Sequence, residues 1–341
     1  MKSKVISFVI CEVPKAKKGE AVPEGGRKSA PPYAEKAVPQ QFIASQADYD
    51  FGGMKAQMTL KSYQPDMLLA ELSFDVPDIF SDNIFNLREA AIDECATILK
   101  NKGGKDVNTF SEEYTVFVIS DYGDKAQNFL ANRDKIASLL KSEKLKLDPH
   151  EVEHTFSSSI KYESNDLVIV DWDGAFVFSP QGEYGEDLRL IQLANMQLLR
   201  YRLLDKDLEG RLKHAVKLVK AAPQEGRLKQ SRALRVAFRE IIGLEARSIS
   251  EFHALEHDVK LIGDWYSARL YELLAKKFKF EEWIKDIKEK LESLEDFYTI
   301  AAENLGFSRT QVLELVQIWA FFVLQIGWFA LIILEFWYFT R

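Results

Sequence analysis

The chain has 341 residues, enough for two domains with appendages, and carries a formal net charge of −7 at pH 7. This acidic balance excludes a protein whose whole surface is built to bind nucleic acid, although a local basic face stays open. The two cysteines, Cys11 and Cys95, lie far apart and in no zinc-ligand spacing, so the sequence predicts neither a disulfide framework nor a zinc knuckle and favours a reducing compartment.

Residues 1–180 combine strand-like and helix-like patterns, which predicts an N-terminal mixed α/β domain. The run 14–41 holds five of the ten prolines and little apolar surface, so we expect a flexible excursion there. Strands are predicted at 5–12, 54–62, 67–76, 113–120, 154–162, 167–171 and 175–178, and helices at 82–101 and 124–143.

The stretch LVIVDWDGAF, residues 167–176, has two interpretations. Haloacid-dehalogenase-type phosphatases present a nucleophilic carboxylate, here Asp171, beside an acid/base carboxylate, here Asp173. Such an enzyme needs further parallel strands downstream to hold Mg²⁺, and the chain after Pro180 is predicted to be helical. We therefore favour a β-hairpin that turns at Asp173-Gly174, where glycine accepts positive φ without penalty. A metal-dependent hydrolase that uses Asp171 and Asp173 is the alternative.

The string His253-Ala254-Leu255-Glu256-His257 fits H-x-x-E-H, in which two histidines one helical turn apart hold Zn²⁺ and the glutamate acts as general base. The acidic residue at a distance suited to a further ligand is Glu335, beyond the apolar segment described below. We therefore predict surface or interhelix histidines, no bound metal and no cofactor. A metal site made by His253, Glu256 and His257 is kept as an alternative.

Two long helices are predicted at 186–222 and 228–276, the first ended by Pro223 and Gly226. Twelve basic residues line this pair, and we interpret them as a solvated face balanced by acidic neighbours. Binding of RNA phosphates or anionic lipid is the alternative, with nucleic acid the less favoured partner. These basic residues are Arg200, Arg202, Lys206, Arg211, Lys213, Lys217, Lys220, Arg227, Lys229, Arg232, Arg235 and Arg239.

An apolar seam follows at spacings of three and four residues, which is typical of a coiled coil. It predicts either self-association or packing on earlier helices of the same chain, and the pattern does not choose between them. Together with the preceding helices it forms a predicted helical stalk over 181–306. The seam residues are Ile284, Ile287, Leu291, Leu294, Tyr298, Ala301 and Leu305.

The segment 315–334 carries no charge, and twenty helical residues match a hydrocarbon layer of about 30 Å. Trp319 stands near one end and Trp337 near the other, as aromatic side chains do at the headgroup layers. Gly306 and the capping box of residues 308–311 predict that a new helix starts near Arg309, giving a transmembrane helix over 309–340.

Two residues near the middle of this span, Gln325 and Gly327, favour oligomerisation, because a buried amide seeks a partner and glycine permits close approach. Lysines and arginines precede the span at Lys276, Lys277, Lys279 and Arg309, whereas only Arg341 follows it. The positive-inside rule therefore places the N-terminal part in the cytoplasm, with a single C-terminal anchor.

The stretch GDWYSARLYELLAKKFKFEEWIKDIKEKLESLEDFY, residues 263–298, ahead of one C-terminal membrane helix, resembles the DUF155 family, which includes the mitochondrial "required for meiotic nuclear division" proteins. The resemblance covers roughly the last half of the chain. It implies a membrane-anchored homo-oligomer without known catalysis, whose mitochondrial members support organellar translation. The N-terminal half has no counterpart in that pattern.

Taken together, the sequence predicts an α+β protein: a mixed α/β domain, long helices that form a hairpin or coiled-coil stalk, and one C-terminal transmembrane helix. The predicted function is that of a membrane-anchored, non-enzymatic, homo-oligomeric scaffold or interaction protein. Its expected partners are membrane lipid, further copies of the chain and a protein that the sequence does not identify.

Overall fold

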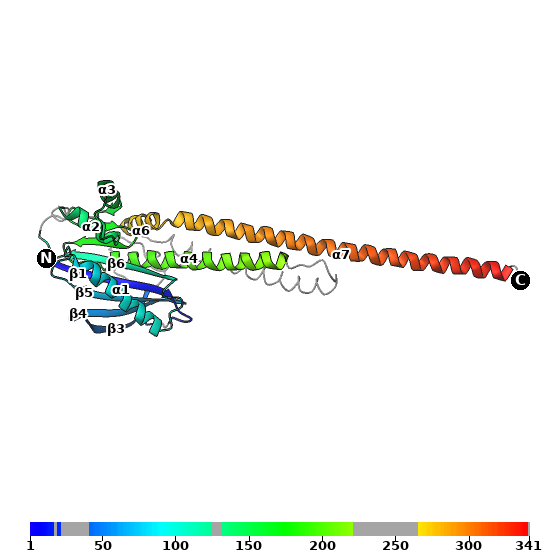
Figure 1. Ribbon diagram of the computed structural model, residues 1–341, viewed down its shortest axis with the longest axis horizontal. Coiled ribbons are helices and arrows are strands. Elements are labelled where there is room, and N and C mark those ends of the chain that lie inside the picture. Colours follow the sequence, from blue (N-terminus) through cyan, green and yellow to red (C-terminus); the bar gives the residue numbers. More distant parts are fainter. Residues whose placement is uncertain (17–18, 22–40, 124–130, 221–264, 340–341) are drawn as a thin grey trace. The chain divides into compact units, whose positions relative to one another are not determined.

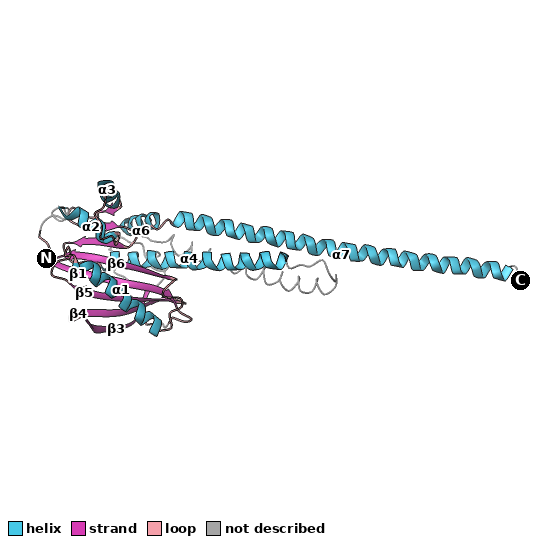
Figure 2. Cartoon of the chain, viewed as in Figure 1, coloured by secondary structure: helices cyan, strands magenta, loops and turns pink. Residues whose placement is uncertain are grey.

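The computed structural model describes residues 1–16, 19–21, 41–123, 131–220 and 265–339. By its contacts the chain divides into two compact units, Met1–Asp205 with Phe252–Asp286, and Lys206–Glu251 with Ile287–Arg341. The sheet therefore shares a unit with the first part of α4 (Gly185–Lys220) and with α6 (Trp265–Lys277), whereas the sequence suggested a boundary near residue 180. Helices and strands are distinguished in Figure 2.

Among the described residues, nine strands form one mixed sheet in the order β2-β3-β4-β5-β1-β6-β9-β8-β7. Neighbouring strands are antiparallel except β6 and β9, which are parallel. The strands, labelled in part in Figure 1, are β1 (Lys2–Glu12), β2 (Glu20–Ala21), β3 (Gln41–Phe51), β4 (Met54–Tyr63), β5 (Met67–Asp75), β6 (Ser111–Ser120), β7 (Ser159–Ile160), β8 (Leu167–Val170) and β9 (Gly174–Ser179).

Helices cover both faces of this sheet, because its central strands are apolar on both sides. In β1, Val5 and Val9 belong to the core that α1 covers, while Phe8 on the opposite face contacts the Tyr114 ring. The helices are α1 (Asn83–Asn101), α2 (Arg133–Leu140), α3 (Pro149–Ser157), α4 (Gly185–Lys220), α6 (Trp265–Lys277) and α7 (Phe280–Phe339).

A cluster of buried polar side chains fastens α4 to its face of the sheet. Gln192 of α4 donates through Nε2 to Glu71 Oε2 at 2.5 Å, and the same carboxylate oxygen lies 2.5 Å from Lys61 Nζ. Gln41 donates to Gln192 Oε1 at 2.9 Å and to the Tyr63 hydroxyl at 2.8 Å. Because buried polar groups are costly unless they are paired, these bonds fix the register of α4 against β3, β4 and β5.

Most strand predictions are confirmed, with three departures in the α/β domain. The strand expected at 154–162 is confirmed only at Ser159–Ile160, which form β7. Before it, α3 occupies Pro149–Ser157, begun by a proline in its first turn and by Asp148, whose side chain accepts from the His150 amide at 2.8 Å. The sequence also gave no sign of β3, because residues 44–48 are exposed and show no buried face. It gave none of β2, Glu20–Ala21, which pairs with β3 inside the run expected to be a flexible excursion.

The β-hairpin interpretation of residues 167–178 is confirmed, but its stated reason is wrong. β8 and β9 pair antiparallel, and the Asp171 amide donates to the Gly174 carbonyl at 2.9 Å. Gly174 does not have positive φ. It is needed for space, because a Cβ there would lie 2.9 Å from the Thr115 carbonyl oxygen of the parallel strand β6.

The predicted helix boundary at Arg309 is also wrong, since α7 runs from Phe280 to Phe339 through Gly306 without a break. One glycine costs a helix about 1 kcal/mol, which sixty continuous helical positions can absorb. Of the helix expected at 228–276, residues 265–276 are helical and the remainder lies outside the described residues. Lys279, with φ of 55°, separates α6 from α7.

The apolar seam falls within α7. Ile287 and Leu294 are buried within the chain, and Ile284 and Leu291 are partly buried. The side chains of Tyr298, Ala301 and Leu305 lie outside what the structure describes. The seam as a contact between copies, and the coiled-coil stalk with it, therefore stay predictions.

We predict that Gly174→Ala lowers the melting temperature of the detergent-solubilised chain by several degrees. Its Cβ would meet the Thr115 carbonyl, and overpacking of this kind costs about 1–3 kcal/mol. Gly185→Ala is the matched control, because a Cβ at Gly185 meets nothing within 4 Å. Equal melting temperatures for the two variants would contradict this account of Gly174.

Candidate functional site

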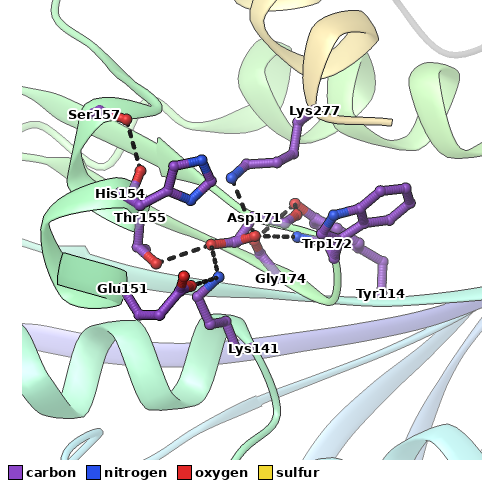
Figure 3. A network of polar contacts seen from close by, with 10 residues as sticks. All are labelled: Tyr114, Lys141, Glu151, His154, Thr155, Ser157, Asp171, Trp172, Gly174 and Lys277. Carbon is purple, nitrogen blue, oxygen red and sulfur yellow. Dashed lines mark hydrogen bonds and ion pairs between the residues drawn. The ribbon is translucent and has the colours of Figure 1, made fainter. Parts of the chain in front are cut away.

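The polar centre of the α/β unit lies at the end of β8, around Asp171. This carboxylate is completely buried, as are the four strand residues before it. Figure 3 shows side chains from four elements converging on it: Lys141 after α2, Thr155 of α3, Tyr114 of β6 and Lys277 at the end of α6.

Each oxygen of the Asp171 carboxylate contacts one neutral donor and one ammonium group. The Trp172 amide donates to Oδ1 at 2.8 Å, and Lys277 Nζ lies 3.2 Å from the same oxygen. The Thr155 hydroxyl donates to Oδ2 at 2.9 Å, and Lys141 Nζ lies 3.2 Å from it. The carboxylate is thus enclosed on both sides by donors.

Further contacts fix the groups that surround Asp171. Lys141 also pairs with Glu151 of α3 at 3.3 Å, so two ammonium groups face two carboxylates. The Tyr114 hydroxyl lies 2.9 Å from the Asp171 carbonyl oxygen and 2.7 Å from that of Gly174, and its proton is donated to these carbonyls. The backbone on both sides of the hairpin turn is therefore held as firmly as the carboxylate.

Burial by itself would raise the pKa of the Asp171 carboxyl. The Lys277 ammonium, the Trp172 amide, the Lys141 ammonium and the Thr155 hydroxyl outweigh this effect, and the pKa is lowered from its ordinary value. Asp171 is therefore an ionised carboxylate at neutral pH although no water reaches it.

Asp173 has a different environment. Its side chain is only partly buried, and burial raises its pKa. The residue is held through its backbone: its carbonyl accepts from Arg88 Nη2 at 3.0 Å and from the Thr115 amide at 3.2 Å. Arg88 is itself buried and also donates through Nε to the Thr115 hydroxyl at 3.3 Å.

This arrangement is that of an internal ion cluster and not of a nucleophile with its acid. A nucleophilic carboxylate needs an oxygen that faces a substrate, and both oxygens of Asp171 point at protein donors in a dry interior. In addition, β8 is antiparallel to β7 and to β9, so Asp171 does not end one of a set of parallel strands. The geometry holds three helices on the sheet.

The alternative metal site falls outside the described residues, because His253, Glu256 and His257 lie within 221–264. In the parts of the chain that the structure describes, no group of three or more His, Cys, Asp and Glu side chains is arranged to hold a metal ion. The five basic positions from Arg227 to Arg239 lie in the same gap.

Sequence reasoning selected Asp171 and Asp173 but missed the residues that determine what Asp171 does. Thr155 was placed in a strand, and Lys277 was noted only as one of several positive charges before the apolar segment. Lys141 had no role. The sequence did hold one signal for these partners: Asp171, a charged residue, directly follows four apolar residues. A carboxylate buried in this way requires cationic partners, which must come from elsewhere in the chain.

The apolar segment near the C-terminus lies in α7. Val316–Glu335 has a mean hydropathy of 2.0 and is long and apolar enough to cross a membrane. Trp319 is 66% exposed, and Gln325 and Gly327 also lie in this exposed stretch, whereas the Trp337 side chain lies outside what the structure describes. Length and composition alone support this statement.

Comparisons with known proteins identify similarity without a function. The model of the family described as "Uncharacterized protein MJ0711, N-terminal domain" matches residues 25–184. The uncharacterized protein MJ0711 of Methanocaldococcus jannaschii is 27% identical over 249 residues, which are 73% of this chain and 74% of that protein. No solved structure matches the chain. The DUF155 resemblance is carried by other residues, 263–298, and stays a prediction.

We predict that Asp171→Asn destabilises the α/β unit by about 3–5 kcal/mol, because it leaves the Lys141 and Lys277 ammonium groups without their buried counter-charge. Denaturant unfolding of the detergent-solubilised chain measures this change. Asp173→Asn is the matched control and should have little effect, since that side chain is partly exposed. Equal stabilities would contradict the ion-cluster interpretation.

The pH dependence of stability follows from the lowered pKa of Asp171. The contribution of this carboxylate is fully present above its ordinary pKa of 3.8 and is lost as the pH falls through the lowered value. The stability difference between wild type and Asp171→Asn should therefore be constant at neutral pH and shrink below about pH 4. Melting temperatures across this range measure it, and a difference independent of pH would contradict the prediction.

Proposed function

We propose that this protein is a membrane-anchored, non-enzymatic interaction protein that self-associates and presents its α/β unit to a partner in the cytoplasm. The observation that carries the proposal is the apolar segment of α7. It supplies twenty residues with no lysine, arginine or aspartate and with a single glutamate at its end.

Exposure of this segment to water would be unfavourable. Its large apolar side chains are 44–73% exposed, among them Leu324, Trp328 and Ile332. Each costs on the order of 1 kcal/mol or more when left in water instead of an apolar medium. A continuous patch of this kind is typical of a membrane or protein contact, and twenty helical residues fit the thickness of a bilayer.

The α/β unit supports a binding role more than a catalytic one. Its most conspicuous carboxylate is occupied by internal donors, so the sequence motif that suggested a phosphatase has a structural explanation. An anchor confines this unit to the membrane plane and raises its effective concentration toward other membrane proteins and toward its own copies. The resemblance to DUF155 proteins implies the same role. The cytoplasmic side is favoured by the positive charges of Lys276 and Lys279 before the span.

The test replaces two exposed residues of the span, Phe322 and Ile326, with lysine. Each charge costs about 2.5–3.5 kcal/mol at the centre of a membrane helix, so the double lysine variant should leave the membrane fraction or be degraded. Phe322→Leu with Ile326→Leu is the matched control and should stay in membranes after an alkaline wash, as wild type does. Wild-type protein that remains monodisperse in buffer without detergent would refute the proposal.

A further inference from the structure

The polar residues of the apolar segment are not scattered around the helix. At about 100° per residue, its residues Gln317, Gln325 and Glu335 fall within a sector of roughly 80°, together with Glu314 just before it. Phe321 and Trp328 fall in the same sector, because Glu314, Phe321, Trp328 and Glu335 follow one another at intervals of seven residues, and Ile332 falls there as well. We name these seven residues the polar stripe.

Gln325 and Gly327, which the sequence suggested as joint contributors to oligomerisation, lie on different faces of the helix. Gln325 and Gly327 are two positions apart, which places them roughly 160° from each other around the helix axis. They cannot both lie in one contact between two helices. Gly327 shares its face with Ala320, and that face offers close approach but no polar group that requires a partner.

Chemistry favours the polar stripe as the contact. A glutamine amide in hydrocarbon is costly unless it is hydrogen-bonded, and Gln317 and Gln325 are exposed along α7. An amide has both donors and an acceptor, so two copies of the same glutamine satisfy each other. The seven-residue spacing is what a left-handed pair of helices needs. Glu314 and Glu335 lie at the ends of the span, where headgroup water solvates their charges.

We propose that α7 pairs with α7 of a second copy of this chain through the polar stripe, with Gln317 and Gln325 hydrogen-bonded across the contact. This inference rests on the proposed function, because it requires the segment to lie in a membrane. It adds the face of the helix and the residues that join the copies.

Single cysteines at Gln317, Gln325, Ala320 and Gly327 test the face, with oxidation in native membranes and detection of covalent dimers. The native Cys11 and Cys95 are fully buried, and burial raises the pKa of Cys11 to about 12, so they do not compete. We expect Gln317→Cys and Gln325→Cys to cross-link several-fold more than Ala320→Cys and Gly327→Cys. Equal or reversed yields, or no cross-link at any position, overturn the proposal.

A second measurement tests the two glutamine amides themselves. It determines the fraction of labelled full-length protein that is dimeric in lipid vesicles. Gln317→Leu with Gln325→Leu should weaken dimerisation about tenfold, close to threefold for each amide lost. Ala320→Leu with Gly327→Leu is the matched control and should leave it unchanged, since a Cβ at Gly327 meets nothing within 4 Å. If the glutamine variant stays in the membrane and dimerises as strongly as wild type, the polar stripe is not the contact and this inference fails. If wild type itself is lost from the membrane fraction, the proposed membrane anchor fails instead.

Discussion

The α/β unit depends on one buried carboxylate. Asp171 lies at the end of β8 and is the common partner of Lys141, Thr155 and Lys277, which come from three helical segments. An uncompensated charge in this position would be very costly, so the three segments must be in place together for the carboxylate to be tolerated. The cluster thus makes docking of α2, α3 and α6 on the sheet mutually dependent.

The same cluster determines where α7 begins. Lys277 is the last residue of α6, and the next residue, Phe278, is fully buried with its ring 5.9 Å from that of Tyr114. Tyr114 in turn donates to the backbone of the Asp171 hairpin. Lys279 then adopts a left-handed conformation, and α7 starts at Phe280. The helix that carries the apolar segment therefore starts from a point fixed by the ion cluster and by aromatic packing.

Local patterns in the sequence were sufficient for most of the sheet, because buried strands are continuous apolar runs with clear ends. They failed where burial and local pattern disagree. β3 is exposed and polar along its middle, and its strand conformation comes from pairing with β4. Near its end α3 contains Thr155 and Phe156, residue types that favour a strand locally, but Asp148 and Pro149 start a helix instead. Asp171 was recognisable as unusual, whereas its partners lie up to 106 positions away in the sequence and had no local signal.

One ion pair crosses the end of the family match. Asp171 lies within residues 25–184, which match the MJ0711 N-terminal domain, and its partner Lys277 lies well beyond them. The similarity to MJ0711 covers 249 residues, so it must continue past residue 184 into the helices. An N-terminal domain ending at residue 184 would leave Asp171 without Lys277 and Phe278 without its place against Tyr114. The physical unit is therefore larger than the matched domain, and it includes α6 and the first residues of α7, up to Asp286.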